Sequence, residues 1–327
     1  MNRRDTVLAL LALGVASLES KAQQPAKIPR IGFLGAGSAS DSYSVSRLAA
    51  FRAGLSELRY VEGKNIRIEP RWADGKYEKL LELAAELVGL NVDVLVTGGI
   101  PAAFAAKKST TKIPIVMAIA GDAVATGLVD SLARPGGNLT GFTYFNPELA
   151  AKRLELLLEV LPGIKTVAML DNSANPMTPR RIQTMKGTAK SLRIGLRLFD
   201  VRRPAEFERA FAGMTKMRAD AVAISDDAML VVHAQALADL AARRRLPSIG
   251  FSEFAESGGL LAYGVNFLEF YRRSAVFVDK ILKGATPAEL PIEQASRFEF
   301  LLNLRTAKAL GVVISRDLLL RADRVIE

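Results

Sequence analysis

The chain has 327 residues, which is too long for one ordinary hydrophobic core and comfortable for two lobes. Its formal net charge is +10, but the basic residues are scattered and no tract interleaves them with aromatic residues, which argues against a nucleic-acid partner. The sequence has no cysteine and one histidine, which excludes disulfides, a cysteine-linked lipid anchor and a multi-histidine metal site.

The first residues have the order of a secretory signal peptide. A basic start at Arg3 and Arg4 precedes an apolar run at residues 7–15, and Ser20 and Ala22 supply the small residues that a signal peptidase reads. The apolar run is too short to cross a bilayer, which needs roughly 20 residues. We therefore expect a signal peptide over residues 1–22 and a mature protein in the periplasm. The Arg3-Arg4 pair leaves the twin-arginine route open.

The rest of the chain alternates short apolar or β-branched runs with longer helical patterns. The expected strands are residues 30–34, 65–70, 92–97, 114–118, 166–170, 195–201, 221–225 and 247–251. The expected helices include residues 47–58, 77–88, 148–160, 179–192, 206–217 and 230–244. This succession predicts an α/β protein with parallel sheets covered on both faces.

The two halves of the chain resemble each other in the order and spacing of these elements. Residues 31–34 align with 167–170, residues 66–68 with 196–198, and residues 91–96 with 218–223. Chance likeness between α/β units is the alternative, because such patterns are common. We interpret the similarity as two βαβαβ lobes in tandem, whose strand-end loops face each other across a ligand cleft.

The strand-end loops contain the candidate ligand-binding residues. Glycines and hydroxyls in the first lobe would suit a carboxylate, while acids and amides in the second would suit an ammonium or sugar hydroxyls. An amino acid or a related zwitterion fits both walls, although turns and helix caps require the same residue types. The candidates are Ser38, Thr97, Gly98, Asp122, Asn172, Asn175, Asp226 and Glu253.

The sequence gives little evidence for a catalytic site. His233 falls inside an expected helix, and no Gly-x-Ser-x-Gly elbow accompanies it. Asp226 and Asp227 are adjacent, so their side chains would point apart rather than form an acid/base pair. We expect no catalytic residue, no metal and no cofactor. Tyr43, Trp72 and Tyr144 could stack on a ligand, although packing in the core or hinge is the commoner role for each.

Several segments resemble the ABC transporter substrate-binding proteins of the tryptophan/tyrosine-uptake-like group. The most specific are Tyr60-Val61-Glu62-Gly63-Lys64-Asn65 and Arg134-Pro135-Gly136-Gly137-Asn138. The other matching segments are residues 30–34, 51–55, 69–75, 151–157 and 303–311. The loop Asp171-Asn172-Ser173 departs from the more neutral loop of many relatives, which puts ligand preference in doubt.

This resemblance implies a type I periplasmic-binding fold with two lobes and a multi-crossing hinge. It places the first lobe at residues 28–144 plus about 258–284, and the second at 145–257 plus about 290–327. The crossings are then expected near residues 140–147, 251–264 and 284–291. The implied function is to capture a small ligand, an aromatic amino acid in some relatives, by hinge closure, as a monomer that delivers it to an inner-membrane ABC permease. A periplasmic sensor module, an exported α/β enzyme and the effector-binding half of a transcription regulator are the alternatives.

Overall fold

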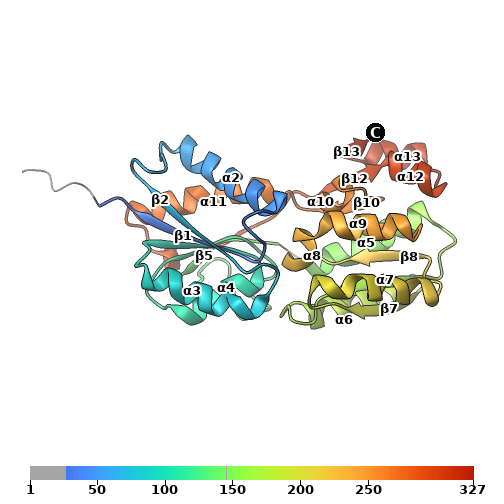
Figure 1. The fold of residues 1–327 in the computed structure, drawn as a ribbon, viewed down its shortest axis with the longest axis horizontal. Helices are drawn as coiled ribbons and strands as arrows, with labels where there is room; N and C mark the ends of the chain where they lie inside the picture. Colours follow the sequence, from blue (N-terminus) through green and yellow to red (C-terminus); the bar gives the residue numbers. More distant parts are fainter. Residues whose placement is uncertain (1–26, 145) are drawn as a thin grey trace, which may run out of the picture.

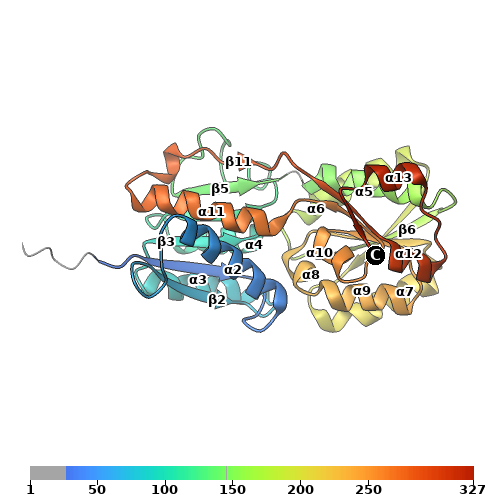
Figure 2. The same cartoon turned by 90° about the horizontal axis from the view of Figure 1, so that it is seen from above.

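The computed structural model describes residues 27–144 and 146–327, so the signal peptide expected at residues 1–22 lies outside the described residues. Two sheets form two lobes that lie side by side along the long axis of the molecule (Figure 1). Seen from above, several segments run between the lobes (Figure 2). Within the described residues, no helix combines the length and the apolar character that a bilayer span requires.

The first lobe is built on a sheet in the order β11-β5-β4-β3-β1-β2. Helices α2 (Ser42–Glu57) and α11 (Phe267–Leu282) cover one face, while α3 (Leu80–Gly89) and α4 (Ile100–Ser109) cover the other (Figure 1). The strands are β1 (Arg30–Gly35), β2 (Arg67–Trp72), β3 (Val94–Gly98), β4 (Ile115–Ala120), β5 (Leu139–Thr143) and β11 (Glu293–Gln294).

Both faces of this sheet are buried, which explains its apolar strands. Along β3, Val94 and Val96 pack against the α2 and α11 side, while Leu95 between them packs against α3 and α4. Alternate side chains of a strand point to opposite faces, so a strand covered on both sides needs an unbroken apolar run.

The second lobe has a sheet in the order β13-β12-β10-β9-β8-β6-β7. Its strands are β6 (Thr166–Asp171), β7 (Gly195–Asp200), β8 (Ala221–Ile224), β9 (Ser248–Gly250), β10 (Leu261–Gly264), β12 (Glu299–Asn303) and β13 (Arg324–Ile326). Its helices are α5 (Asn146–Val160), α6 (Thr178–Ser191), α7 (Phe207–Lys216), α8 (Ala228–Val232), α9 (Ala234–Arg243), α10 (Ser252–Glu256), α12 (Leu304–Leu310) and α13 (Arg316–Arg321). Single 3₁₀ turns at Tyr77–Lys79, Pro204–Glu206 and Pro287–Glu289 complete the described elements.

The first five strands of each lobe are arranged alike. The order β2-β1-β3-β4-β5 in the first sheet matches β7-β6-β8-β9-β10 in the second, with parallel pairing throughout. The repeat inferred from the sequence is therefore present in the topology. One expected helix differs: residues 230–244 are not continuous, because the chain breaks at His233 between α8 and α9.

Two of the expected crossings fall later in the chain than the sequence suggested. Strand β10 pairs with β9 and β12 in the second sheet, so the return to the first lobe comes after Gly264 rather than near residue 258. Strand β11 pairs with β5 in the first sheet, so the last crossing follows Gln294 rather than residues 284–291. The first crossing lies between Thr143, at the end of β5, and the start of α5.

Candidate functional site

A cavity lies between the lobes at the carboxyl ends of both sheets, where open parallel sheets bind their ligands. The empty volume between the lining atoms is about 450 Å³, and this figure includes space that is open to solvent. Most of the lining is apolar or aromatic, and both lobes contribute to it. The lining residues are Arg47, Gly99, Ile100, Pro101, Ile119, Gly121, Tyr144, Asn175, Met177, Arg181, Asp226, Ala228, Val231, Phe267 and Tyr271.

Arg47 supplies the cation of the first lobe. Helix α2 begins after Asp41, whose carboxylate accepts the Ser44 amide at 2.6 Å, and Arg47 follows on the buried face of this helix. The residue is only 9% exposed. Its guanidinium lies 3.5 Å from the ring centroid of Tyr43 and 5.2 Å from that of Tyr271. These rings attract the charge through their faces and fix its position.

One donor of Arg47 has no partner. The guanidinium donates to the Tyr43 hydroxyl, but its Nε is shielded from solvent without a hydrogen bond. Among the described residues, no carboxylate oxygen lies within 4.0 Å of the Arg47 nitrogens. A buried donor without a hydrogen-bond partner is costly, so the Nε of Arg47 is prepared to donate to an anion.

Tyr271 reaches the cavity because Gly98 leaves room for it. A Cβ at position 98 would lie 1.9 Å from the Tyr271 hydroxyl oxygen. Any side chain at the end of β3 would therefore push this ring away from the place that it occupies beside Arg47. A glycine is required at position 98 because a larger residue would displace the ring of Tyr271.

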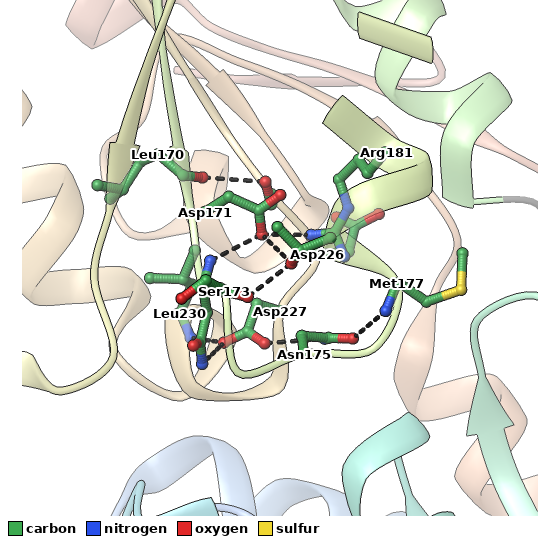
Figure 3. A network of polar contacts seen from close by, with 12 residues as sticks. Leu170, Asp171, Ser173, Asn175, Met177, Arg181, Asp226, Asp227 and Leu230 are labelled. Carbon is green, nitrogen blue, oxygen red and sulfur yellow. Dashed lines mark hydrogen bonds and ion pairs between the residues drawn. The ribbon is translucent and has the colours of Figure 1, made fainter. Parts of the chain in front are cut away.

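Two acids of the second lobe, Asp171 and Asp226, are already paired with arginines, and Figure 3 shows Asp171 with Arg181. Asp171, at the end of β6, accepts from Arg181 on α6 at 2.8 Å, and both side chains are almost fully buried. Asp226, after β8, lies 2.7 Å from the Arg153 guanidinium, and this pair is equally buried. Burial raises the pKa of Asp171 to about 6, although Arg181 opposes the rise.

Asp227 is held by five donors and links the lobes. Its carboxylate caps α8 by accepting the amides of Met229 and Leu230 at 3.0 and 3.3 Å. It also accepts from Asn172 at 3.2 Å and from Asn175 at 2.9 Å. The fifth donor is the hydroxyl of Tyr77, which reaches Asp227 from the first lobe at 2.7 Å.

Other contacts also join the two lobes. Arg180 lies 3.2 Å from the carboxylate of Asp122, which itself caps the turn after β4 by accepting from Ala125. Met177 packs against the end of β4, where a Cβ at Gly121 would be 3.3 Å from its Cγ. These contacts bring the walls together, so the structure describes a closed arrangement of the lobes.

Glu253 stands next to this wall on α10. Its Oε2 is shielded from solvent and has no hydrogen bond, and the positive charge of Arg47 is the main effect that offsets the burial of its own charge. Burial raises the pKa of Glu253 to about 7. The residue does not line the cavity itself.

A family model described as ABC transporter substrate binding protein matches residues 43–326. The chain belongs to this family. A curated tyrosine-binding protein from Clostridioides difficile is 25% identical to this chain over 264 residues, which are 80% of this chain and 75% of that protein.

Solved structures agree with this assignment. An ABC domain from Streptococcus pneumoniae, solved in complex with L-Trp, has 25% identity, covers 91% of this chain and 99% of its own, and has a TM-score of 0.83. A conserved domain protein from Vibrio cholerae, also 25% identical, covers 91% of this chain and 100% of its own with a TM-score of 0.85. The substrate-binding protein described here therefore has the type I periplasmic-binding fold that its sequence predicted.

Two of the residues predicted for the ligand site line the cavity of this substrate-binding protein, namely Asn175 and Asp226. Both are already engaged: Asn175 donates to Asp227 and accepts the Met177 amide, and Asp226 pairs with Arg153. These two residues, which were expected to bind a ligand ammonium, therefore already interact with other groups of the protein.

The other predicted residues lie behind or beside the wall. Ser38 belongs to the cap of α2, where its amide donates to Asp41, and Thr97 is fully buried within β3. Asn172 supports Asp227. Gly98, Asp122 and Glu253 have the neighbours described above.

Sequence reasoning missed Arg47, Phe267 and Tyr271. A signal existed for Arg47, because Arg47, Phe51 and Leu55 follow each other at four-residue intervals and therefore share one helix face. A charge on an apolar helix face is uncommon and indicates a special role.

Metal binding and histidine chemistry find no support in the part of the chain that is described. No group of three His, Cys, Asp or Glu residues there could hold a metal ion. His233 lies at the break between α8 and α9 against the ring of Phe207, with 5.7 Å between centroids, and burial lowers its pKa.

Proposed function

We propose that this protein is the periplasmic solute-binding component of an ABC importer and that it closes over a carboxylate with an apolar body, such as an aromatic or branched-chain amino acid. The carboxylate accepts from Arg47, and the body lies among the apolar residues of the cavity. The protein acts by binding and performs no reaction. We further propose that it is a monomer, that it is exported by a cleaved signal peptide at residues 1–22, and that an inner-membrane permease receives its ligand.

The observation that carries this proposal is the unpartnered Nε of Arg47 at an apolar cavity. A buried guanidinium is stabilised most by an oxygen anion, which it binds through short, charge-assisted hydrogen bonds. Ile100, Met177 and Phe267 are among the neighbours that would surround the rest of the ligand. The tryptophan complex and the tyrosine-binding protein among its relatives support an aromatic ligand.

The lobes are expected to close on the ligand because both of them contribute residues to the cavity. Arg47 and Ile100 belong to the first lobe, whereas Met177 and Val231 belong to the second. A ligand that contacts both sets stabilises the closed form over the open form by its differential affinity for the two. The contact of Tyr77 with Asp227 closes the same interface.

The test is the affinity of purified protein, wild type and Arg47→Met, for a panel of aromatic and branched-chain amino acids by isothermal titration calorimetry. Loss of one partner of a buried charge pair costs about 2–5 kcal/mol, so the variant should bind at least about 30-fold more weakly. Arg52→Met is the control, because Arg52 lies on the same helix but pairs with Glu62 at the surface. Equal affinities for wild type and Arg47→Met would contradict the proposed carboxylate contact.

Export is tested separately by expressing the full chain in a diderm bacterium. The proposal predicts that the periplasmic protein begins at Gln23 when its N-terminus is sequenced. An uncleaved protein that stays in the cytoplasm would contradict the signal peptide but not the ligand site.

A further inference from the structure

The arginines around the cavity differ in whether they have a carboxylate partner. Arg47, Arg153 and Arg181 are all almost fully buried. Arg153 and Arg181 each have a carboxylate at hydrogen-bonding distance, at 2.7 and 2.8 Å. Arg47 has aromatic rings and a hydroxyl around it instead, and no ion pair within the described residues.

The carboxylates at the cavity wall, unlike the Nε of Arg47, already have partners within the protein. Asp226 is the acid that lines the cavity, and Arg153 holds it. Asp171 is held by Arg181, and Asp227 has five donors from both lobes. Asp122 pairs with Arg180, and Glu253 does not line the cavity.

A ligand ammonium would therefore compete with an arginine for any carboxylate of the wall. Drawing Asp226 toward an ammonium would weaken its contact with Arg153 and leave that guanidinium buried with a poorer partner. An ammonium that found no carboxylate would be desolvated without a counter-charge. A ligand carboxylate, by contrast, completes the hydrogen bonding of Arg47 without breaking an ion pair.

We infer that the cavity recognises the carboxylate of its ligand and not the α-ammonium, so that its ligands include aromatic or branched-chain monocarboxylic acids without an α-amino group. Asp171 and Asp226 of the second lobe, which arginines already hold, and the free Nε donor of Arg47 in the first lobe form a site for a monoanion. This inference rests on the proposed function, because it concerns the same cavity and the same contact with Arg47.

The experiment compares matched ligands by isothermal titration calorimetry on the protein that lacks residues 1–22. The pairs are L-tryptophan with indole-3-propionate, L-phenylalanine with 3-phenylpropionate, and L-leucine with 4-methylpentanoate. Tryptamine and phenethylamine, which have the ammonium but no carboxylate, complete the panel. In the pair that binds, we expect the acid to bind no more than tenfold more weakly than the amino acid, and the amines not to bind.

Each outcome separates this inference from the proposed function. If an amino acid binds more than tenfold more tightly than its matched acid, the inference is wrong while the proposed function stands. If neither member of any pair binds, the proposed ligand class fails and the inference fails with it. Arg47→Met should weaken both members of the binding pair by the same factor, and a loss for the amino acid alone would also overturn the inference.

Discussion

At the residue scale, Glu253 is the acid whose charge a bound carboxylate would disturb most. It shares the surroundings of Arg47, Tyr43 and Tyr271, and the carboxylate of Glu256 is also near it. Its raised pKa of about 7 means that it releases its proton within the range of ordinary buffers. A ligand carboxylate beside Arg47 adds a second negative charge, which favours the protonated form of Glu253.

This coupling predicts that ligand binds more tightly as the pH falls from 8 to 6, with proton uptake on binding. Glu253→Gln should remove this dependence and bind at pH 8 as tightly as the wild type does at pH 6. The measurement is calorimetric titration at several pH values, with Glu159→Gln as control, because Glu159 is paired with Arg321 on the surface. Affinity that rises with pH in the wild type would contradict the assignment.

The same groups set the pH dependence of stability without ligand. The pKa values of Glu253 and Asp171 are raised above their ordinary values of 4.5 and 3.8, so the folded protein binds these protons more tightly than the unfolded chain. Their contribution to stability is thus fully present below about pH 4 and is lost as the pH rises through about 6 and 7. Denaturant unfolding across this range measures the effect.

At the scale of elements, the short helix α8 joins the two walls of the cavity. Asp227 caps this helix and accepts from Tyr77 of the other lobe at 2.7 Å. Tyr77→Phe should lower ligand affinity by about fivefold, because closure loses a hydrogen bond worth about 1 kcal/mol. Tyr60→Phe is the control, since its hydroxyl donates to Asp279 within the first lobe at 3.0 Å. Equal affinity losses in both variants would show that the effect is not specific to the interface.

The end of β3 gives a second prediction at this scale. Gly98→Ala places a methyl group on the Tyr271 hydroxyl and forces this ring out of position beside Arg47. We expect at least about fivefold weaker binding, since overpacking a fixed wall costs about 1–3 kcal/mol. Gly89→Ala, where no atom lies within 4 Å of the added Cβ, should bind as the wild type does. Unchanged affinity in Gly98→Ala would show that Tyr271 is not needed at the wall.

Some of these elements were predictable from sequence and others were not. Strands such as β4 and β8 are apolar over their whole length, which reflects burial on both faces and is visible in the chain. The break at His233 was missed because residues 230–244 keep a helical pattern across it. Strand β11 has two residues, both exposed, and only its pairing with β5 defines it.

The sequence predicted where the candidate site lies, but not which of its residues are free to bind a ligand. The rule that ligands bind beyond the carboxyl ends of parallel strands led to Asn175 and Asp226, which line the cavity. Their pairing with Asp227 and Arg153 depends on contacts between residues that are far apart in the sequence. Arg47 lies within a helix rather than in a strand-end loop, so a search of the loops did not reach it.

At the scale of the whole molecule, two sheets of like topology lie side by side (Figure 1). Residues that follow the strands of both sheets line one cavity. The chain crosses from one lobe to the other after β5, after β10 and after β11, so three connecting segments join the lobes rather than one linker. Such a connection permits the lobes to close as rigid bodies around a hinge. The candidate site adjoins the closure interface, because Gly121 and Met177 line the cavity and also pack against each other across the lobes.

The most direct test of this account is a crystal structure of the protein with the tightest ligand found in the panel. The account predicts that the ligand lies between the lobes with a carboxylate oxygen about 2.7–2.9 Å from Nε of Arg47 and its apolar body among Ile100, Met177 and Phe267. A ligand bound outside this cavity, or one whose carboxylate points away from Arg47, would contradict it.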